Sequence, residues 1–173
     1  MKQIQHNPNN NSLAWYIFYT TPRAEKVVYR DLEKNGMEVF LPLRKVSKIW
    51  KNRQHKIIEE PIFPSYIFIK TNQNKIYSIL RHPKICTYIS FLGKPSTISE
   101  KDIEAIKIMI SSEETIETNE FYEGEKVRVI RGVLNGYEGI LCSRKGKNKF
   151  GIKIQGVDII ASIEISISDV IKI

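Results

Sequence analysis

The first long hydrophobic run of the chain, residues 14–20, is rich in aromatic and β-favouring side chains and therefore predicts a strand. Directly after it, apolar residues recur every four positions and predict a helix with one apolar stripe: Ala24, Val28 and Leu32. We expect Thr21 to cap this helix, Pro22 to occupy its first position and Gly36 to end it.

The pattern between this helix and residue 110 predicts further strands and two more helices. We expect strands at 39–43, 65–70 and 87–91, a long hairpin over 44–60, and helices around 73–81 and after Ser99. Ser99 followed by Asp102 resembles a capping box for the last helix. The resulting order, β-α-β-β-β-α-β-α, predicts a ferredoxin-like α/β sandwich in which helices pack on one mixed sheet, so the chain is of the α+β class.

The last fifty residues have a different pattern. Val127 and Val129 alternate with charged residues, glycines recur at 132, 136 and 139, and alternation resumes at Phe150. Short alternating runs separated by glycine turns predict a small β-barrel of five strands. Between the two patterns lies an acidic stretch with little to bury, which predicts a linker. We therefore divide the chain into a disordered tail (1–12), a first domain (13–110), a linker (111–121) and a second domain (122–173).

The net charge of +8 is unevenly distributed. Residues 13–110 carry 17 Lys and Arg against 9 Asp and Glu, a net charge of +8, whereas residues 111–121 carry four Glu and no base. A positive surface on the first domain favours polyanionic partners, usually nucleic acid or an acidic protein face.

Two sets of basic residues are candidates for nucleic-acid contact. Arg23, Lys26 and Arg30 share one face of the first helix, although a solvated helix face has the same pattern. The predicted hairpin is a basic arm whose candidates are Lys48, Lys51 and Arg53. Trp50 on this arm either stacks on bases or packs on the opposite face of the hairpin, and the sequence leaves both open.

Two prolines bracket an aromatic residue before the strand at 65–70. Pro61 and Pro64 favour an extended backbone around Phe63, which predicts a stiff, outward-pointing aromatic suited to docking. The alternative is that Phe63 belongs to the core, because aromatic side chains supply much of any core's burial.

Several of these motifs, in this order, resemble the NusG family over residues 13–173. They are Trp15-Tyr16, the helix after Thr21-Pro22-Arg23, the strand Glu38 to Pro42, Phe63-Pro64-Ser65-Tyr66, and Val127-x-Val129-x-x-Gly132-x-x-x-Gly136-x-x-Gly139. The resemblance implies a NusG N-terminal domain followed by a KOW β-barrel. The stretch from Glu60 to Ile69 is similar to specialised antiterminators of the RfaH and UpxY types.

The resemblance also implies partners. Family members bind the clamp helices of the RNA polymerase β′ subunit, and Tyr19, Phe63 and Tyr66 match that surface. The resemblance also implies contact with the non-template DNA strand or nascent RNA, for which the candidate residues are Arg23, Lys26, Arg81 and Lys84. Thr21 and Pro22 stand where RfaH has two basic residues, which argues against RfaH-like DNA reading.

We therefore expect a transcription antitermination factor that binds RNA polymerase and promotes its processive elongation through specific operons, those for polysaccharide synthesis. The alternatives are a general NusG-like factor and a KOW-type protein that binds RNA or the ribosome. The KOW domain of the family can bind a ribosomal protein or termination factor, but Gln155-Gly156 replaces the phenylalanine-glycine of the general factor, which argues against such coupling.

The sequence does not predict an enzyme. The three histidines lie far apart, with no metal-ligand spacing and no neighbouring nucleophile, so we expect neither catalysis nor a cofactor nor a metal. No apolar run is long enough for a membrane helix, and residues 1–12 lack the apolar core of a signal peptide. We therefore expect a cytoplasmic monomer.

Overall fold

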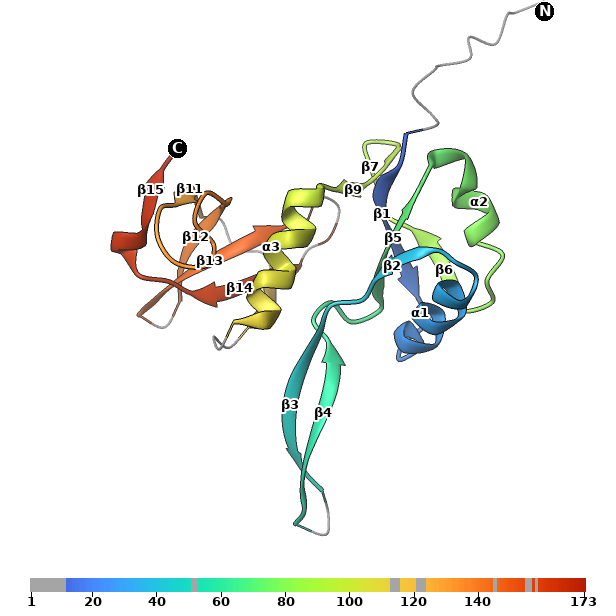
Figure 1. The fold of residues 1–173 in the computed structure, drawn as a ribbon, viewed down its shortest axis with the longest axis horizontal. Coiled ribbons are helices and arrows are strands. Elements are labelled where there is room, and N and C mark those ends of the chain that lie inside the picture. The colour runs from blue at the N-terminus through green and yellow to red at the C-terminus, as the bar shows by residue number, and fades with distance from the viewer. Residues whose placement is uncertain are drawn as a thin grey trace, which may run out of the picture.

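The structure is a computed structural model that describes residues 12–50, 53–112, 116–120, 124–144, 146–154, 157 and 159–173. Two main sheets occupy the two halves of the chain, and a helix lies between them (Figure 1). The helices are α1 (Glu25–Lys34), η2 (Gln73–Lys75), α2 (Ile76–Ile79), α3 (Glu100–Ser111) and η3 (Ile167–Asp169). In place of the helix predicted around 73–81 there is therefore a 3-10 turn followed by one short α-helix.

The N-terminal sheet has five strands in the order β2-β5-β1-β6, with β9 also pairing with β1. They are β1 (Ala14–Thr20), β2 (Glu38–Phe40), β5 (Tyr66–Thr71), β6 (Ile85–Tyr88) and β9 (Thr97–Ile98). The α/β sandwich is confirmed, but every pairing in this sheet is antiparallel, so the expectation of a mixed sheet was wrong.

Both faces of the N-terminal sheet are covered. Successive side chains of β1 point to opposite faces, as in any strand. Tyr16 and Phe18 pack with residues of α1 and α2 on one face. Trp15 and Ile17 belong to a separate buried cluster that includes residues of α3. The central strand therefore contributes to two cores, which explains why its hydrophobic run is nearly continuous.

The predicted start of the first helix was wrong, whereas the cap of the last helix is confirmed. α1 begins at Glu25, because Arg23 adopts a left-handed φ of 64° and the N-cap position is taken by Ala24, which makes no side-chain cap hydrogen bond. At α3, the Ser99 hydroxyl accepts a hydrogen bond from the Asp102 backbone N–H at 3.0 Å, as the capping box predicts.

The predicted hairpin is present and projects away from both sheets (Figure 1). It consists of β3 (Leu43–Ile49) and β4 (His55–Pro61), with a register that runs from Leu43 opposite Pro61 to Ile49 opposite His55. A second, much smaller hairpin of β7 (Ser90–Phe91) and β8 (Lys94–Pro95) follows β6.

The C-terminal sheet is antiparallel and has six strands in the order β10-β14-β13-β12-β11-β15. They are β10 (Glu117–Glu120), β11 (Glu125–Val129), β12 (Glu138–Arg144), β13 (Lys147–Lys153), β14 (Ile159–Glu164) and β15 (Val170–Lys172). A small β-rich domain that fits a KOW domain is confirmed, with six strands instead of five. Residues 117–120, predicted as part of the linker, instead pair with β14 along the edge of this sheet.

One buried cluster joins the two halves of the molecule. It contains Ile106 and Met109 of α3, Phe68 of the N-terminal sheet, and Phe150 and Ile152 of the C-terminal sheet. Polar contacts lie around it, since the Lys101 ammonium donates to the Gly136 carbonyl at 3.0 Å and the Arg44 guanidinium donates to the Ile116 carbonyl at 3.2 Å. α3 thus packs against both sheets.

Candidate functional site

The first candidate surface is an aromatic pair at the end of two central strands. Tyr19 of β1 and Tyr66 of β5 are register partners, and their ring centroids lie 5.2 Å apart in an edge-to-face arrangement. Both side chains are half-buried. Two adjacent aromatic rings held on sheet strands can form the centre of a protein interface.

Phe63 does not point outward as predicted. Its side chain is fully buried, and its ring packs edge-to-face on Phe68 with 5.7 Å between centroids. It belongs to the cluster shared by the N-terminal sheet, α3 and the C-terminal sheet. The bracketing residue that reaches solvent is Pro64, which is exposed. The stiff segment therefore turns its aromatic side chain inward, and a role for Phe63 in partner contact stays a prediction.

The turn between Phe63 and Tyr66 is held by a buried carboxylate that the sequence did not reveal. Glu25 of α1 is 5% exposed, and its Oε1 accepts a hydrogen bond from the Ser65 backbone N–H at 2.6 Å. The Ser65 carbonyl in turn accepts from the Thr20 backbone N–H at 2.8 Å. α1 thus fixes the backbone that positions Tyr66, through contacts forty residues apart in sequence. No local pattern predicts them.

Ser65 occupies a left-handed conformation, with φ of 66°. This conformation is strained for any residue with a Cβ atom. We expect Ser65→Gly to raise the free energy of unfolding by roughly 0.5–1 kcal/mol, less than the full strain because glycine is also more flexible when unfolded. Urea unfolding measures the change. Ser65→Ala keeps the Cβ atom and is the matched control, and an equal gain in both variants would contradict the strain argument.

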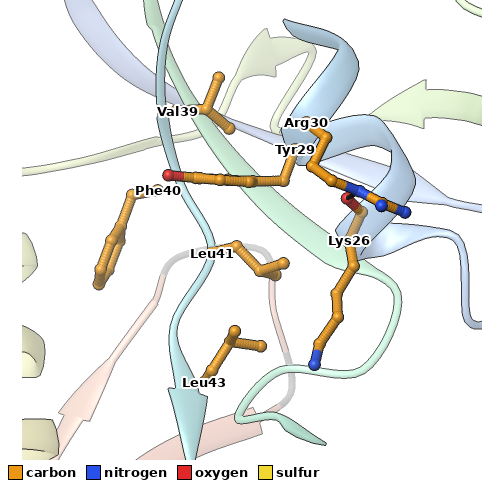
Figure 2. Close-up of a pocket in the computed structure, with 7 residues that line it drawn as sticks. All are labelled: Lys26, Tyr29, Arg30, Val39, Phe40, Leu41 and Leu43. Carbon is orange, nitrogen blue, oxygen red and sulfur yellow. Dashed lines mark hydrogen bonds between the residues drawn. The ribbon is translucent and has the colours of Figure 1, made fainter. Parts of the chain in front are cut away.

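The second candidate surface is a basic groove between α1 and the segment from β2 to β3 (Figure 2). Its volume is about 490 Å³, and its lining comprises two cations and five largely apolar side chains: Lys26, Arg30, Tyr29, Val39, Phe40, Leu41 and Leu43. In Figure 2 the Tyr29 ring extends from α1 toward β2, and the Lys26 side chain passes Leu41 toward Leu43. Sequence reasoning identified the two cations but missed the apolar floor.

Local contacts fix the side chains around this groove. The Lys26 ammonium lies 3.8 Å from a Glu59 carboxylate oxygen, which connects α1 to the base of the hairpin. Arg30 Nε donates to the Lys26 carbonyl at 3.2 Å. The Tyr29 hydroxyl donates to Glu33 at 2.7 Å, and this hydrogen bond raises the pKa of Tyr29 above its ordinary value. Arg30 and Lys26 are both exposed, so the groove has a positive rim.

The basic residues after α2 lie near the start of α1. The Thr21 backbone N–H donates to the Lys84 carbonyl at 3.0 Å, and His82 Nε2 lies 3.3 Å from an Asp31 carboxylate oxygen. These contacts bring the loop that carries Arg81 and Lys84 beside the loop that carries Arg23. All three cations are exposed. Residues predicted from two distant stretches of sequence therefore share one end of the first domain.

The remaining predicted cations lie on the projecting hairpin. Lys48 and Arg53 are exposed, whereas Lys51 lies outside the described residues. The Lys48 ammonium hydrogen-bonds the Glu60 carboxylate, and this interaction lowers the pKa of Glu60 below its ordinary value. The predicted nucleic-acid residues therefore lie in two regions, on the hairpin and around the first part of α1.

A family model described as "Transcription termination factor nusG" matches residues 13–107, which is more than half of the chain. The chain belongs to the NusG family. In this NusG-family protein the matched segment runs from β1 into α3, and it contains every residue predicted here for polymerase or nucleic-acid contact.

Relatives cover nearly the whole NusG-family chain. The transcription termination/antitermination protein NusG of Campylobacter jejuni is 28% identical over 174 residues, covering 92% of this chain and 97% of the relative. That of Rickettsia bellii is 24% identical, covering 98% and 95%. The solved structure "Domain interaction in Thermotoga maritima NusG" matches with a TM-score of 0.53 and 21% identity, covering 94% of this chain and 98% of the other. At that identity the structural likeness shows the fold.

Two further features of this NusG-family protein bear on the expectations about metal ions and membranes. Among the described residues, no group of three or more His, Cys, Asp or Glu side chains is arranged to hold a metal ion. No helix in the described ranges is long and apolar enough to cross a membrane. Gln155-Gly156 and residues 1–11 lie outside the described part of the chain.

Proposed function

We propose that this NusG-family protein is a transcription termination/antitermination factor that binds RNA polymerase and promotes processive elongation. The observation that carries the proposal is the family match across residues 13–107, within which Tyr19 and Tyr66 form an accessible aromatic pair. The names of relatives that align over most of the chain support the same role. The proposal is for a transcription factor and assigns no catalytic step.

The polymerase contact proposed here is the β′ clamp helices, bound at Tyr19 and Tyr66. Aromatic residues in a packed, partly exposed setting supply much of the binding energy at protein interfaces. Phe63 is fully buried in the shared cluster, and Tyr66 packs against that cluster. Direct contact of Phe63 with the polymerase requires the cluster between the two sheets to open.

Truncation of the aromatic pair tests this proposal. We expect Tyr19→Ala and Tyr66→Ala each to weaken binding of the full-length protein to core RNA polymerase by about 30-fold or more, the loss typical of a central interface residue. Biolayer interferometry with immobilised polymerase measures the affinity, and thermal melting checks that each variant is folded.

The matched control is Tyr77→Ala. Tyr77 on α2 forms a similar edge-to-face pair with Tyr88 and is 71% exposed, so its truncation removes the same atoms from a different surface. We expect little effect on polymerase affinity. Equal losses in all three variants would contradict the assignment of the contact to Tyr19 and Tyr66. Co-purification of ribosomal particles without polymerase would contradict polymerase binding and favour the RNA- or ribosome-binding alternative.

We also propose that the cations of the first domain contact the non-template DNA strand or nascent RNA. Arg23, Arg81 and Lys84 gather at one end of the domain, and the hairpin carries a second basic group. Exposed lysine and arginine neutralise phosphates and release counterions, so this affinity falls as salt rises. The likeness of the segment from Glu60 to Ile69 to specialised antiterminators supports action on specific operons, such as those for polysaccharide synthesis. We propose that the protein acts as a cytoplasmic monomer.

A further inference from the structure

The two faces of the projecting hairpin carry different chemistry. Residues that are register partners in an antiparallel pair share a face, and alternate residues along each strand do the same. One face therefore carries Lys48 and Lys56, and Trp50 follows on the same face at the next alternate position. We call this face the Trp50 face. The opposite face carries Ile49 and Ile57, both exposed.

On the Trp50 face, an aromatic ring is displayed to solvent. The Trp50 side chain is 52% exposed, and the Lys56 ammonium lies 4.3 Å from its ring centroid. The ring has not folded onto the apolar residues of the opposite face, which was the alternative open from the sequence. The ring and the ammonium are therefore adjacent, so one ligand with an aromatic face and a negative charge can contact both.

The same face carries an unfavourable pair of like charges. Lys48 and Lys56 are directly opposite each other in the register, an arrangement that destabilises a hairpin by itself. The Lys48 ammonium reaches toward the base of the arm to Glu60, and the Lys56 ammonium reaches toward the tip to Trp50. In the described part of the chain, Lys56 has no carboxylate within ion-pair distance. An anion bound beside Lys56 would supply the missing counter-charge.

Backbone hydrogen bonds fix the position of Trp50. Its N–H donates to the Gln54 carbonyl at 3.0 Å, and its carbonyl accepts from the Arg53 N–H at 2.8 Å. Arg53 closes this turn in a left-handed conformation with φ of 59°. A ring held in this way loses little freedom on binding, which favours affinity.

We propose that Trp50 and Lys56 form a stacking site for an unpaired base of single-stranded nucleic acid, while Lys48 and Arg53 contact neighbouring phosphates. The inference rests on the nucleic-acid contact proposed above and specifies its site and strandedness. A base in a duplex already stacks on its neighbours, so an exposed ring gains most from an unpaired base. A membrane surface fits less well, because the exposed Ile49 and Ile57 lie on the face opposite Trp50 and Lys56, so one flat surface cannot contact both sets.

The test uses the full-length protein and a fluorescent single-stranded dodecamer of thymidylate, with the matching duplex for comparison. Of the two tryptophans, Trp15 is 3% exposed and donates to Glu100, so quenching of exposed tryptophan fluorescence reports on Trp50. We expect the single strand to quench Trp50 more than the duplex does. By anisotropy, Trp50→Leu should weaken single-strand binding by between about 5-fold and about 100-fold.

Matched variants on the opposite face separate stacking from charge. Lys45 lies on that face, so Lys45→Gln removes the same charge as Lys56→Gln, and we expect Lys56→Gln to weaken binding more. Ile57→Thr should leave binding unchanged. If Trp50→Leu binds like the unchanged protein while both lysine variants lose affinity equally, the stacking site is overturned and the wider nucleic-acid proposal stands.

Two further results overturn more than the stacking site. Absence of binding to any oligonucleotide at low salt would overturn the nucleic-acid contact itself, together with the stacking site. Quenching of Trp50 by phosphatidylglycerol vesicles, without quenching by the oligonucleotide, would assign the arm to a lipid surface instead.

Discussion

Replacing Phe63 with alanine should lower the free energy of unfolding by about 3–5 kcal/mol, the usual cost of truncating a fully buried phenylalanine. The Phe63 side chain has no exposed surface and packs on Phe68 within the cluster that joins the two sheets. Its removal leaves a cavity that its neighbours fill only in part. Urea unfolding followed by far-ultraviolet circular dichroism measures the loss.

Phe91→Ala is the control for this truncation. Phe91 on β7 is 46% exposed, so the same change should alter stability by no more than about 1 kcal/mol. If Phe63→Ala is as mild as Phe91→Ala and yet abolishes polymerase binding, then Phe63 faces solvent in the working protein. That result would restore the outward orientation first predicted from the two prolines.

The different outcomes for Phe63 and for the first strand show what local sequence can predict. The run at residues 14–20 predicts a strand because its successive side chains, which point to opposite faces, are apolar on both faces of a covered sheet. The direction of Phe63 depends on distant partners. The Ile62 N–H donates to the Pro42 carbonyl at 2.8 Å, and the Glu25 carboxylate accepts from the Ser65 N–H. Stiff prolines limit the backbone, but these long-range bonds decide which way it turns.

The same distinction applies to the candidate sites. The basic residues of the hairpin and the alternation in its strands were visible in the sequence, so the arm and its charge were predictable. The assignment of Trp50 to one face required the register, which sets Lys48 opposite Lys56. Near the base of the hairpin, the groove beside Lys26 required α1 to pack next to β2, and no spacing in the sequence indicates that contact.

The acidic stretch shows a different limit. Composition predicted a linker over 111–121, because glutamates bury little apolar surface. In the structure, Glu117 to Glu120 form an edge strand on β14, where backbone hydrogen bonds need no apolar side chain from the edge strand itself. A sheet edge can therefore recruit a polar segment, and composition alone does not reveal it.

The C-terminal sheet depends on Gly139, which the sequence pattern grouped with the turn glycines. A Cβ atom at Gly139 in β12 would lie 2.6 Å from the Gly151 carbonyl oxygen and 2.6 Å from the Phe150 ring. Both contacts are far shorter than van der Waals distance, and the first is with backbone, which cannot move without disturbing the pairing of β12 with β13. This glycine is required for close packing and not for a turn.

Gly139→Val should therefore destabilise the C-terminal sheet by more than about 3 kcal/mol, beyond the usual cost of overpacking, because its first added carbon already overlaps backbone. We expect the dispersed amide signals of residues 124–173 to collapse in a nitrogen-15 spectrum while those of β1 and β5 persist. Ser143→Val, at an exposed position of the same strand, should leave the spectrum dispersed. Because Tyr19 and Tyr66 lie on the N-terminal sheet, polymerase binding should survive Gly139→Val, and its loss would place part of that contact on the C-terminal sheet.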